Sequence, residues 1–144
     1  MSTKPVVSIV KGKFPPDRQE IDGMVRRAVD LAGGLQSKIK KGSHVVLKPN
    51  LFAPYPPPIS VDRRVISTMV RLAREAGAKR VTVIEGVSMG TLIKRVRPSA
   101  TPCSMNRGFK TAEIMHLLGI KREVEEAGGE VMSVEDAEKV EVNI

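Results

Sequence analysis

Residues 44–50 read His-Val-Val-Leu-Lys-Pro-Asn, an apolar run that stops at a lysine and a proline. A short run rich in β-branched residues is typical of a buried β-strand. Proline lacks the backbone N–H that a sheet ladder needs, so this strand must end before Pro49. We therefore expect a strand over residues 44–48, followed by a stiff, proline-rich loop over residues 49–58.

Strand and helix patterns alternate on both sides of this run. The expected strands are residues 6–10, 44–48, 81–85, 131–134 and, at an edge, 140–144, and the expected helices are residues 17–31, 62–76, 111–118 and 121–127. This order predicts an α/β fold of three layers, with right-handed crossovers. The expected sheet is mostly parallel, has four to five strands, and carries helices on both faces. Because the strands are continuous apolar runs, we expect both of their faces to be buried.

The composition excludes several classes of protein. The chain has 144 residues, of which 41% are apolar and one, Cys103, is a cysteine. This length suits a single domain over residues 1–144. One cysteine excludes an internal disulfide and a four-cysteine zinc or iron–sulfur site within this chain. No other cofactor is indicated by the sequence, so the cofactor is unknown. No apolar run approaches the ~20 residues of a spanning helix and no secretory signal is visible, so we expect a cytoplasmic protein without a membrane partner.

Charge is distributed unevenly along the chain. The net charge is +8, but residues 1–122 carry 23 lysines and arginines against 8 acids, and residues 123–144 carry 1 lysine against 8 acids. The basic part favours an anionic partner, although a solvated basic surface explains the same composition. Residues 92–110 are expected to form a long, basic, mobile loop or lid, whose cations are Lys94, Arg95, Arg97, Arg107 and Lys110.

Polar residues follow two of the expected strands directly. Lys48 ends one expected strand and Asn50 follows it, while Glu85 ends the next strand and Gly86 and Ser88 follow that one. In open parallel sheets, ligands bind beyond the carboxyl ends of the strands. The lysine could bind a phosphate or carboxylate, the asparagine could donate and accept, and the glutamate could act as a general base or ligate a hard cation. Alternatively, Lys48 and Glu85 form a structural ion pair, and Asn50 bonds the backbone of its own turn.

Other candidate residues carry weaker signals. Arg63 and Arg64 begin the second expected helix near the same sheet end, where they either face an anion or lie on the surface. His44 and His116 have no cysteine or acid at metal-ligand spacing, so no metal site is predicted. Cys103 lies near arginines in the sequence, which could lower its pKa, but no placed histidine supports its use as a nucleophile.

The same residues carry a resemblance to a known family. The chain resembles domain-of-unknown-function family 362 from about Val6 to Val134. The matching features, in order, are Val45-Val46-Leu47-Lys48-Pro49-Asn50-Leu51, Asp62, Ala76-Gly77-Ala78-Lys79-Arg80-Val81 before Glu85-Gly86, Thr111-Ala112 with Gly119-Ile120, and Ala127-Gly128-Gly129-Glu130-Val131. The resemblance implies an α/β domain without an agreed reaction. Many relatives are longer and carry a ferredoxin-like cysteine cluster beside this domain; this chain departs from them in its single cysteine and in residues 92–110.

The sequence is compatible with three functions. The favoured one is binding of a small anionic ligand through Lys48, Asn50, Gly86, Ser88, Arg63 and Arg64, with Glu85 as the candidate general base. The first alternative is a basic module that binds nucleic acid or an acidic protein through residues 92–110. The second is a scaffold or electron-transfer partner of an iron–sulfur protein. Whether the chain is an enzyme, and its oligomeric state, stay undecided.

Overall fold

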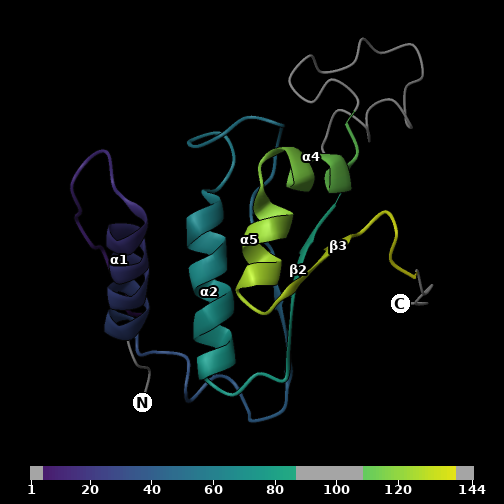
Figure 1. Cartoon of the computed structure of the whole chain (residues 1–144). Helices are drawn as coiled ribbons and strands as arrows, with labels where there is room; N and C mark the ends of the chain where they lie inside the picture. The colour runs from purple at the N-terminus through teal and green to yellow at the C-terminus, as the bar shows by residue number, and fades with distance from the viewer. Residues whose placement is uncertain (1–4, 87–108, 139–144) are drawn as a thin grey trace.

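The computed structural model describes residues 5–86 and 109–138. Expected features at residues 87–108 and 140–144, including Ser88, Cys103 and most of the basic loop, lie outside the described residues. The chain forms an α/β domain (Figure 1) whose elements are α1 (Arg18–Leu31), β1 (His44–Leu47), α2 (Arg63–Glu75), β2 (Arg80–Glu85), α4 (Thr111–Leu117), α5 (Ile120–Glu126) and β3 (Glu130–Ser133). The expected helices and three of the expected strands are therefore confirmed within a residue or two.

Aspartates set the start of the two long helices. The Asp17 carboxylate accepts the Glu20 N–H at 2.8 Å at the head of α1, and Asp62 accepts the Arg64 N–H at 2.9 Å at the head of α2. Each carboxylate thus binds a backbone donor that has no partner within the helix. The start of each helix is fixed at the residue where the sequence changes from loop to apolar stripe.

The described strands form one parallel sheet in the order β1-β2-β3. Val45 pairs with Val81, and Val83 pairs with Val131. β2 is hydrogen-bonded on both sides, and its residues Val81 and Val83 are no more than 1% exposed. The parallel pairing that the alternation predicted is confirmed, with β2 as the central strand.

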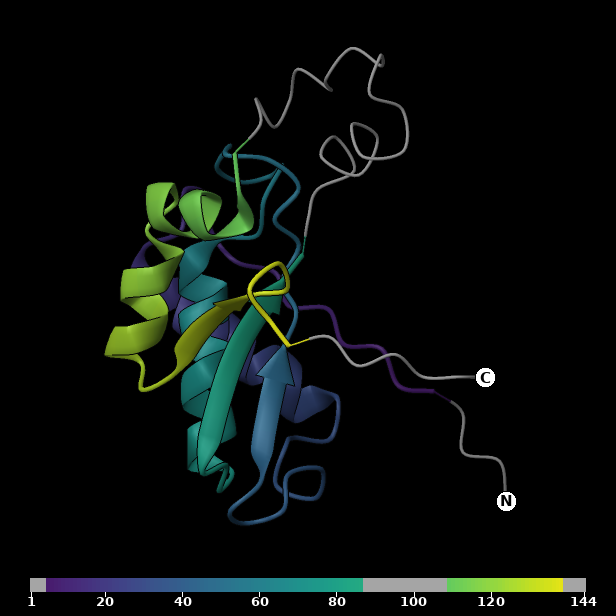
Figure 2. The ribbon, with the colours of Figure 1, turned by 90° about the vertical axis from the view of Figure 1, so that its right-hand side faces the viewer.

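All the described helices lie on one face of this sheet, which corrects the prediction of helices on both faces. Figure 2 looks onto the open face, with α2 and α5 behind the strands and α1 behind α2. Both crossovers are right-handed and both move in the same direction along the sheet, so they must cover the same face. Helices on both faces require a reversal of strand order, and the described sheet of three strands, fewer than predicted, has none.

The prediction of a first strand at residues 6–10 is also wrong. These residues are not part of the sheet, and Val6, Val7 and Ile9 are 68%, 82% and 89% exposed. A side-chain hydrogen bond from Ser8 Oγ to the Ala28 carbonyl at 2.7 Å holds the segment against α1. A β-branched run becomes a strand only when a neighbouring strand pairs with it, which local sequence cannot ensure.

The open face corrects the prediction of strands buried on both faces as well. Burial alternates along β1, and Val46 is 55% exposed. Its neighbours in β1, Val45 and Leu47, pack against the core under the helices. A valine on the open face of a sheet looks the same in the sequence as a buried valine. The sequence alone therefore could not show whether one face or both faces of the strand are buried.

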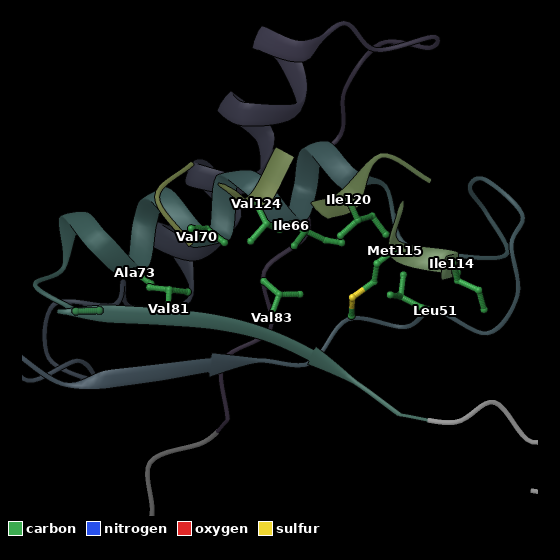
Figure 3. Packing of buried hydrophobic residues seen from close by; sticks show 11 residues of the cluster. Leu51, Ile66, Val70, Ala73, Val81, Val83, Ile114, Met115, Ile120 and Val124 are labelled. Atoms are coloured by element: carbon green, nitrogen blue, oxygen red, sulfur yellow. The ribbon is translucent and has the colours of Figure 1, made fainter. Parts of the chain in front are cut away.

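The core lies between the sheet and helices α2, α4 and α5 (Figure 3). It is aliphatic, as the scarcity of aromatic residues in the sequence requires, and its buried members are Leu51, Ile66, Val70, Ala73, Ala78, Val81, Val83, Ile114, Met115, Ile120 and Val124. Gly129, just before β3, brings the backbone so close that a Cβ there would lie 2.9 Å from Val70 and 3.0 Å from Val124.

Helix α1 is attached to α2 mainly through charges, since Ile21 is its one buried residue. Asp22 accepts hydrogen bonds from Thr68 at 2.9 Å and from Arg71 and Arg26 at 2.7 Å each. Burial raises the pKa of Asp22, but the bonds from these three side chains outweigh burial and lower the pKa to about 2. The ionised carboxylate therefore favours the docked position of α1.

Asp22→Asn should lower stability by about 1 to 2 kcal/mol at neutral pH, because the amide cannot replace three charge-assisted bonds. The native pKa of Asp22 lies below its unfolded value, so its contribution is present above about pH 4 and is lost as the pH falls toward 2. Urea unfolding across this range should show a weaker acid dependence in the variant. Asp30→Asn, an exposed change on the same helix, serves as the control; an equal loss there would contradict the assignment.

Gly129→Ala should destabilise the domain by about 1 to 3 kcal/mol, because the new methyl group would press on Val70 and Val124. Gly23→Ala provides the opposite case, since Gly23 lies inside α1 and a methyl group added there would have no neighbouring atom within 4 Å. That change should stabilise by about 0.5 to 1 kcal/mol through helix propensity. Thermal unfolding of both variants measures these changes in stability. A change of the same sign in both variants would contradict the packing described for Gly129 and Gly23.

Candidate functional site

Lys48 and Glu85 meet where β1 and β2 end. Since Leu47 pairs with Val83, Lys48 comes level with the last residues of β2. Its ammonium Nζ lies 2.9 Å from each carboxylate oxygen of Glu85. The lysine side chain is 67% exposed and the glutamate side chain 12% exposed. The fold thus holds a carboxylate in place and presents the cation that binds it to solvent.

This pair borders an open hollow of about 420 Å³. Its lining residues are Lys48, Ile84, Glu85, Gly86 and Val134. The Gly86 N–H donates to Glu85 Oε2 at 3.1 Å, which gives the carboxylate a backbone partner in addition to the lysine. The hollow therefore offers a hydrogen-bond donor with positive charge beside an acceptor with negative charge, together with apolar lining from Ile84 and Val134.

Three polar residues beside the hollow were not predicted as site residues. Thr111 Oγ1 donates to the Gly86 carbonyl at 2.9 Å and lies 3.3 Å from Glu135 Oε1, and Ser133 Oγ donates to Glu135 Oε2 at 3.2 Å. They bring a second carboxylate to this edge of the sheet. Ser133 is the last residue of β3 and Glu135 follows it, just as Glu85 ends β2 and Gly86 follows. The rule that ligands bind beyond the carboxyl ends of parallel strands would therefore have pointed to Ser133 and Glu135 as well.

Asn50 lies after β1 but does not line this hollow. Its side-chain amide donates to the Ile59 backbone carbonyl at 3.4 Å, and the backbone carbonyl of Asn50 accepts the Val61 N–H at 3.0 Å. Both bonds join the two ends of the proline-rich loop. Of the residues expected together, the structure brings together Lys48, Glu85 and Gly86, while Ser88 lies outside the described residues.

Arg63 and Arg64 line a different cavity, of about 300 Å³, at the head of α2. The other lining residues are Pro56, Pro57, Val61, Asp62 and Leu118, so the two cavities share no residue. Arg64 pairs with Asp62 at 2.7 Å and donates to the Pro16 carbonyl at 2.9 Å. The hydrogen bond from Arg64 lowers the pKa of the Asp62 carboxyl. Arg64 is therefore engaged in holding the loop before α1 against the start of α2.

Arg63 binds a buried carboxylate that the sequence did not single out. Its Nε donates to Glu123 Oε1 at 3.3 Å, and Arg18 also pairs with Glu123, which is 4% exposed. Hydrogen bonds from both arginines lower the pKa of Glu123, and the bond from Arg18 has the larger effect. One acid on α5 thus joins the first turns of α1 and α2, which makes this cluster a structural junction.

The two histidines take different positions. His44 Nε2 lies 2.7 Å from Thr82 Oγ1 on the open face of the sheet, and Thr82 donates in turn to Glu130. His116 lies in the last turn of α4. Within residues 5–86 and 109–138, no three histidine, cysteine, aspartate or glutamate side chains gather as a set that could hold a metal ion. The helices in this part of the chain are also too short or too polar to cross a membrane.

The family model for Domain of unknown function (DUF362) matches residues 45–144. The chain belongs to this family. The match begins at the second residue of β1 and includes Lys48, Asn50, Glu85 and Gly86, whereas α1 lies before it. Comparison with curated proteins and comparison with solved structures each gave no match.

Lys48→Gln should change the stability of this DUF362 domain by less than about 1 kcal/mol. The lysine is largely exposed, and an exposed ion pair contributes little to folding. Chemical denaturation at neutral pH measures the change. A loss of more than about 2 kcal/mol would show instead that the pair fastens β1 to β2, the structural alternative for these two residues.

Proposed function

We propose that this DUF362 domain binds a small anionic ligand, bearing a phosphate or carboxylate group, in the hollow beyond β1 and β2. The observation that carries the proposal is the exposed lysine Lys48, whose ammonium group is held 2.9 Å from the Glu85 carboxylate and which lines that hollow together with Glu85. An ammonium group has three donors, so it can bind a ligand oxygen while it keeps its bond to the glutamate. A hollow of about 420 Å³ is within the size range of small-molecule sites.

The Glu85 carboxylate limits which anions are suitable. It already balances the charge of Lys48, so an anion with no hydrogen-bond donor gains little here. A ligand that carries a hydroxyl or amino group beside its anionic group can donate to Glu85 and accept from Lys48 at the same time. In this arrangement Glu85 is the residue in a position to take a proton from the ligand.

The other proposed ligand residues have secondary roles. Gly86 has no side chain to fill the hollow, and a Cβ there would touch Val134 at 3.5 Å. Asn50 holds the proline-rich loop that follows β1, and Ser88 is included because of its place in the sequence after β2. Arg63 and Arg64 bind Glu123 and Asp62, so they would contact only a ligand that extends to the head of α2.

A pair of matched ligands tests the proposal. Glycerol 3-phosphate has a phosphate and two hydroxyl groups, and methyl phosphate has the phosphate alone. We expect glycerol 3-phosphate to raise the midpoint of thermal unfolding more than methyl phosphate does, and Lys48→Gln to reduce its affinity about tenfold, as loss of a charged hydrogen bond would.

Lys121→Gln is the control, because Lys121 is an exposed lysine on α5 with an acid 3.9 Å away. It should bind glycerol 3-phosphate as the unaltered chain does. Equal affinities for Lys48→Gln and the unaltered chain, or no stabilisation by either phosphate compound, would overturn the proposal.

A further inference from the structure

Four exposed lysines gather at the end of the sheet opposite the proposed ligand site. Lys38, Lys40 and Lys41 lie between α1 and β1, and Lys79 lies between α2 and β2. Both connections lie at the lower end of the molecule in Figures 1 and 2. Within the part of the chain that the structure describes, no carboxylate oxygen lies within 4.0 Å of these four ammonium groups.

Backbone hydrogen bonds hold the two connections together. The Gly42 N–H donates to the Gly77 carbonyl at 2.8 Å, and the Lys79 N–H donates to the Ser43 carbonyl at 2.9 Å. Gly77 has a φ of 106°, and a Cβ there would lie 3.4 Å from the Lys41 Cα. The backbones that carry the lysines are therefore in contact, and the positions from which the four side chains extend are held together before any partner binds.

Apolar anchors turn the lysines outward. Ile39, which lies between two of the lysines, packs against the core, and Ala78, just before Lys79, is 5% exposed. The Arg74 guanidinium donates to the carbonyls of Ala78 and Lys79, which adds a further cation and secures the turn. The lysine side chains are thus left as the groups that face solvent here.

The nearby carboxylates do not neutralise this surface. Glu75 pairs with Arg26 at 2.7 Å, and Glu130 pairs with Arg80. The bond from Arg80 lowers the pKa of Glu130, so this acid stays ionised and bound to its own partner. Asp30 lies in the last turn of α1, so one further acid precedes the connection that carries three of the four lysines.

We infer that this basic end, defined as Lys38, Lys40, Lys41 and Lys79, binds the phosphate backbone of double-stranded nucleic acid without reading its sequence. Lysines are mobile point charges suited to phosphate contacts, and such contacts position a protein but carry no sequence information. The two connections, residues 32–43 and 76–79, contain no aromatic residue, so they offer no stacking surface for a single strand. This surface differs both from the ligand site and from the basic stretch at residues 92–110.

Fluorescence anisotropy with a labelled duplex of mixed sequence tests the inference across a range of salt. The variant Lys41→Gln with Lys79→Gln removes one lysine from each connection. Because each phosphate contact contributes about 0.9 to the slope of log affinity against log salt, the variant should have a slope smaller by about 2 and should bind at least about tenfold more weakly at low salt. The thermal midpoint, expected unchanged, checks that both proteins are folded.

The control is Lys121→Gln with Arg122→Gln, which removes the same charge from α5, where Glu125 and Glu126 lie 3.9 and 3.8 Å away. It should keep the affinity and the slope of the unaltered chain. Equal weakening of control and variant would overturn the inference, because net charge alone would then explain binding. So would undetectable duplex binding at about 20 mM salt, or binding to phosphatidylserine vesicles without binding to the duplex.

Discussion

The structure depends on one strand, β2, which is hydrogen-bonded on both edges and covered on one face by α2 and α5. Because both crossovers are right-handed and run in the same direction, they place their helices on the same side. The core forms there, around Val81 and Val83. The opposite face stays open in the described part of the chain, and the two ends of the sheet are among the places where polar side chains from different segments meet.

Several arginines in residues 5–86 and 109–138 hold helices together, whereas the lysines discussed above are exposed. Arginines bind carboxylates at the junctions between helices: Arg71 and Arg26 bind Asp22, and Arg18 and Arg63 bind Glu123. A guanidinium group can form several directed bonds at once, which suits a partly buried junction. The exposed lysines at the carboxyl end and at the basic end take little part in holding the fold. They are the cations that the two proposals assign to a partner.

The two proposed binding regions lie at opposite ends of the same two strands. At the carboxyl end, one lysine shares a hollow with a fixed carboxylate, which favours a small molecule with both an anionic group and a donor. At the amino end, four lysines project from two connected loops, which favours an extended polyanion. Because no residue belongs to both, each proposal can be tested by substitutions that leave the other region unchanged. Helix α1 has no residue in either proposed region, and it lies before the segment that the DUF362 model matches.

The sequence by itself determined the identity and order of the helices and of β1, β2 and β3, because periodic apolar positions and capping aspartates are local signals. It also predicted that Lys48 and Glu85 would share one edge, since parallel strands joined by a helix end on the same side. Only the tertiary structure decided that residues 6–10 are not a strand, that Val46 faces solvent, and that Arg63 and Arg64 bind Glu123 and Asp62 rather than line the hollow beside Lys48. Those outcomes depend on which segments pair across the sheet and which charges meet between helices, and residues such as Arg18 and Glu123, far apart in the chain, give no local sign that they will meet.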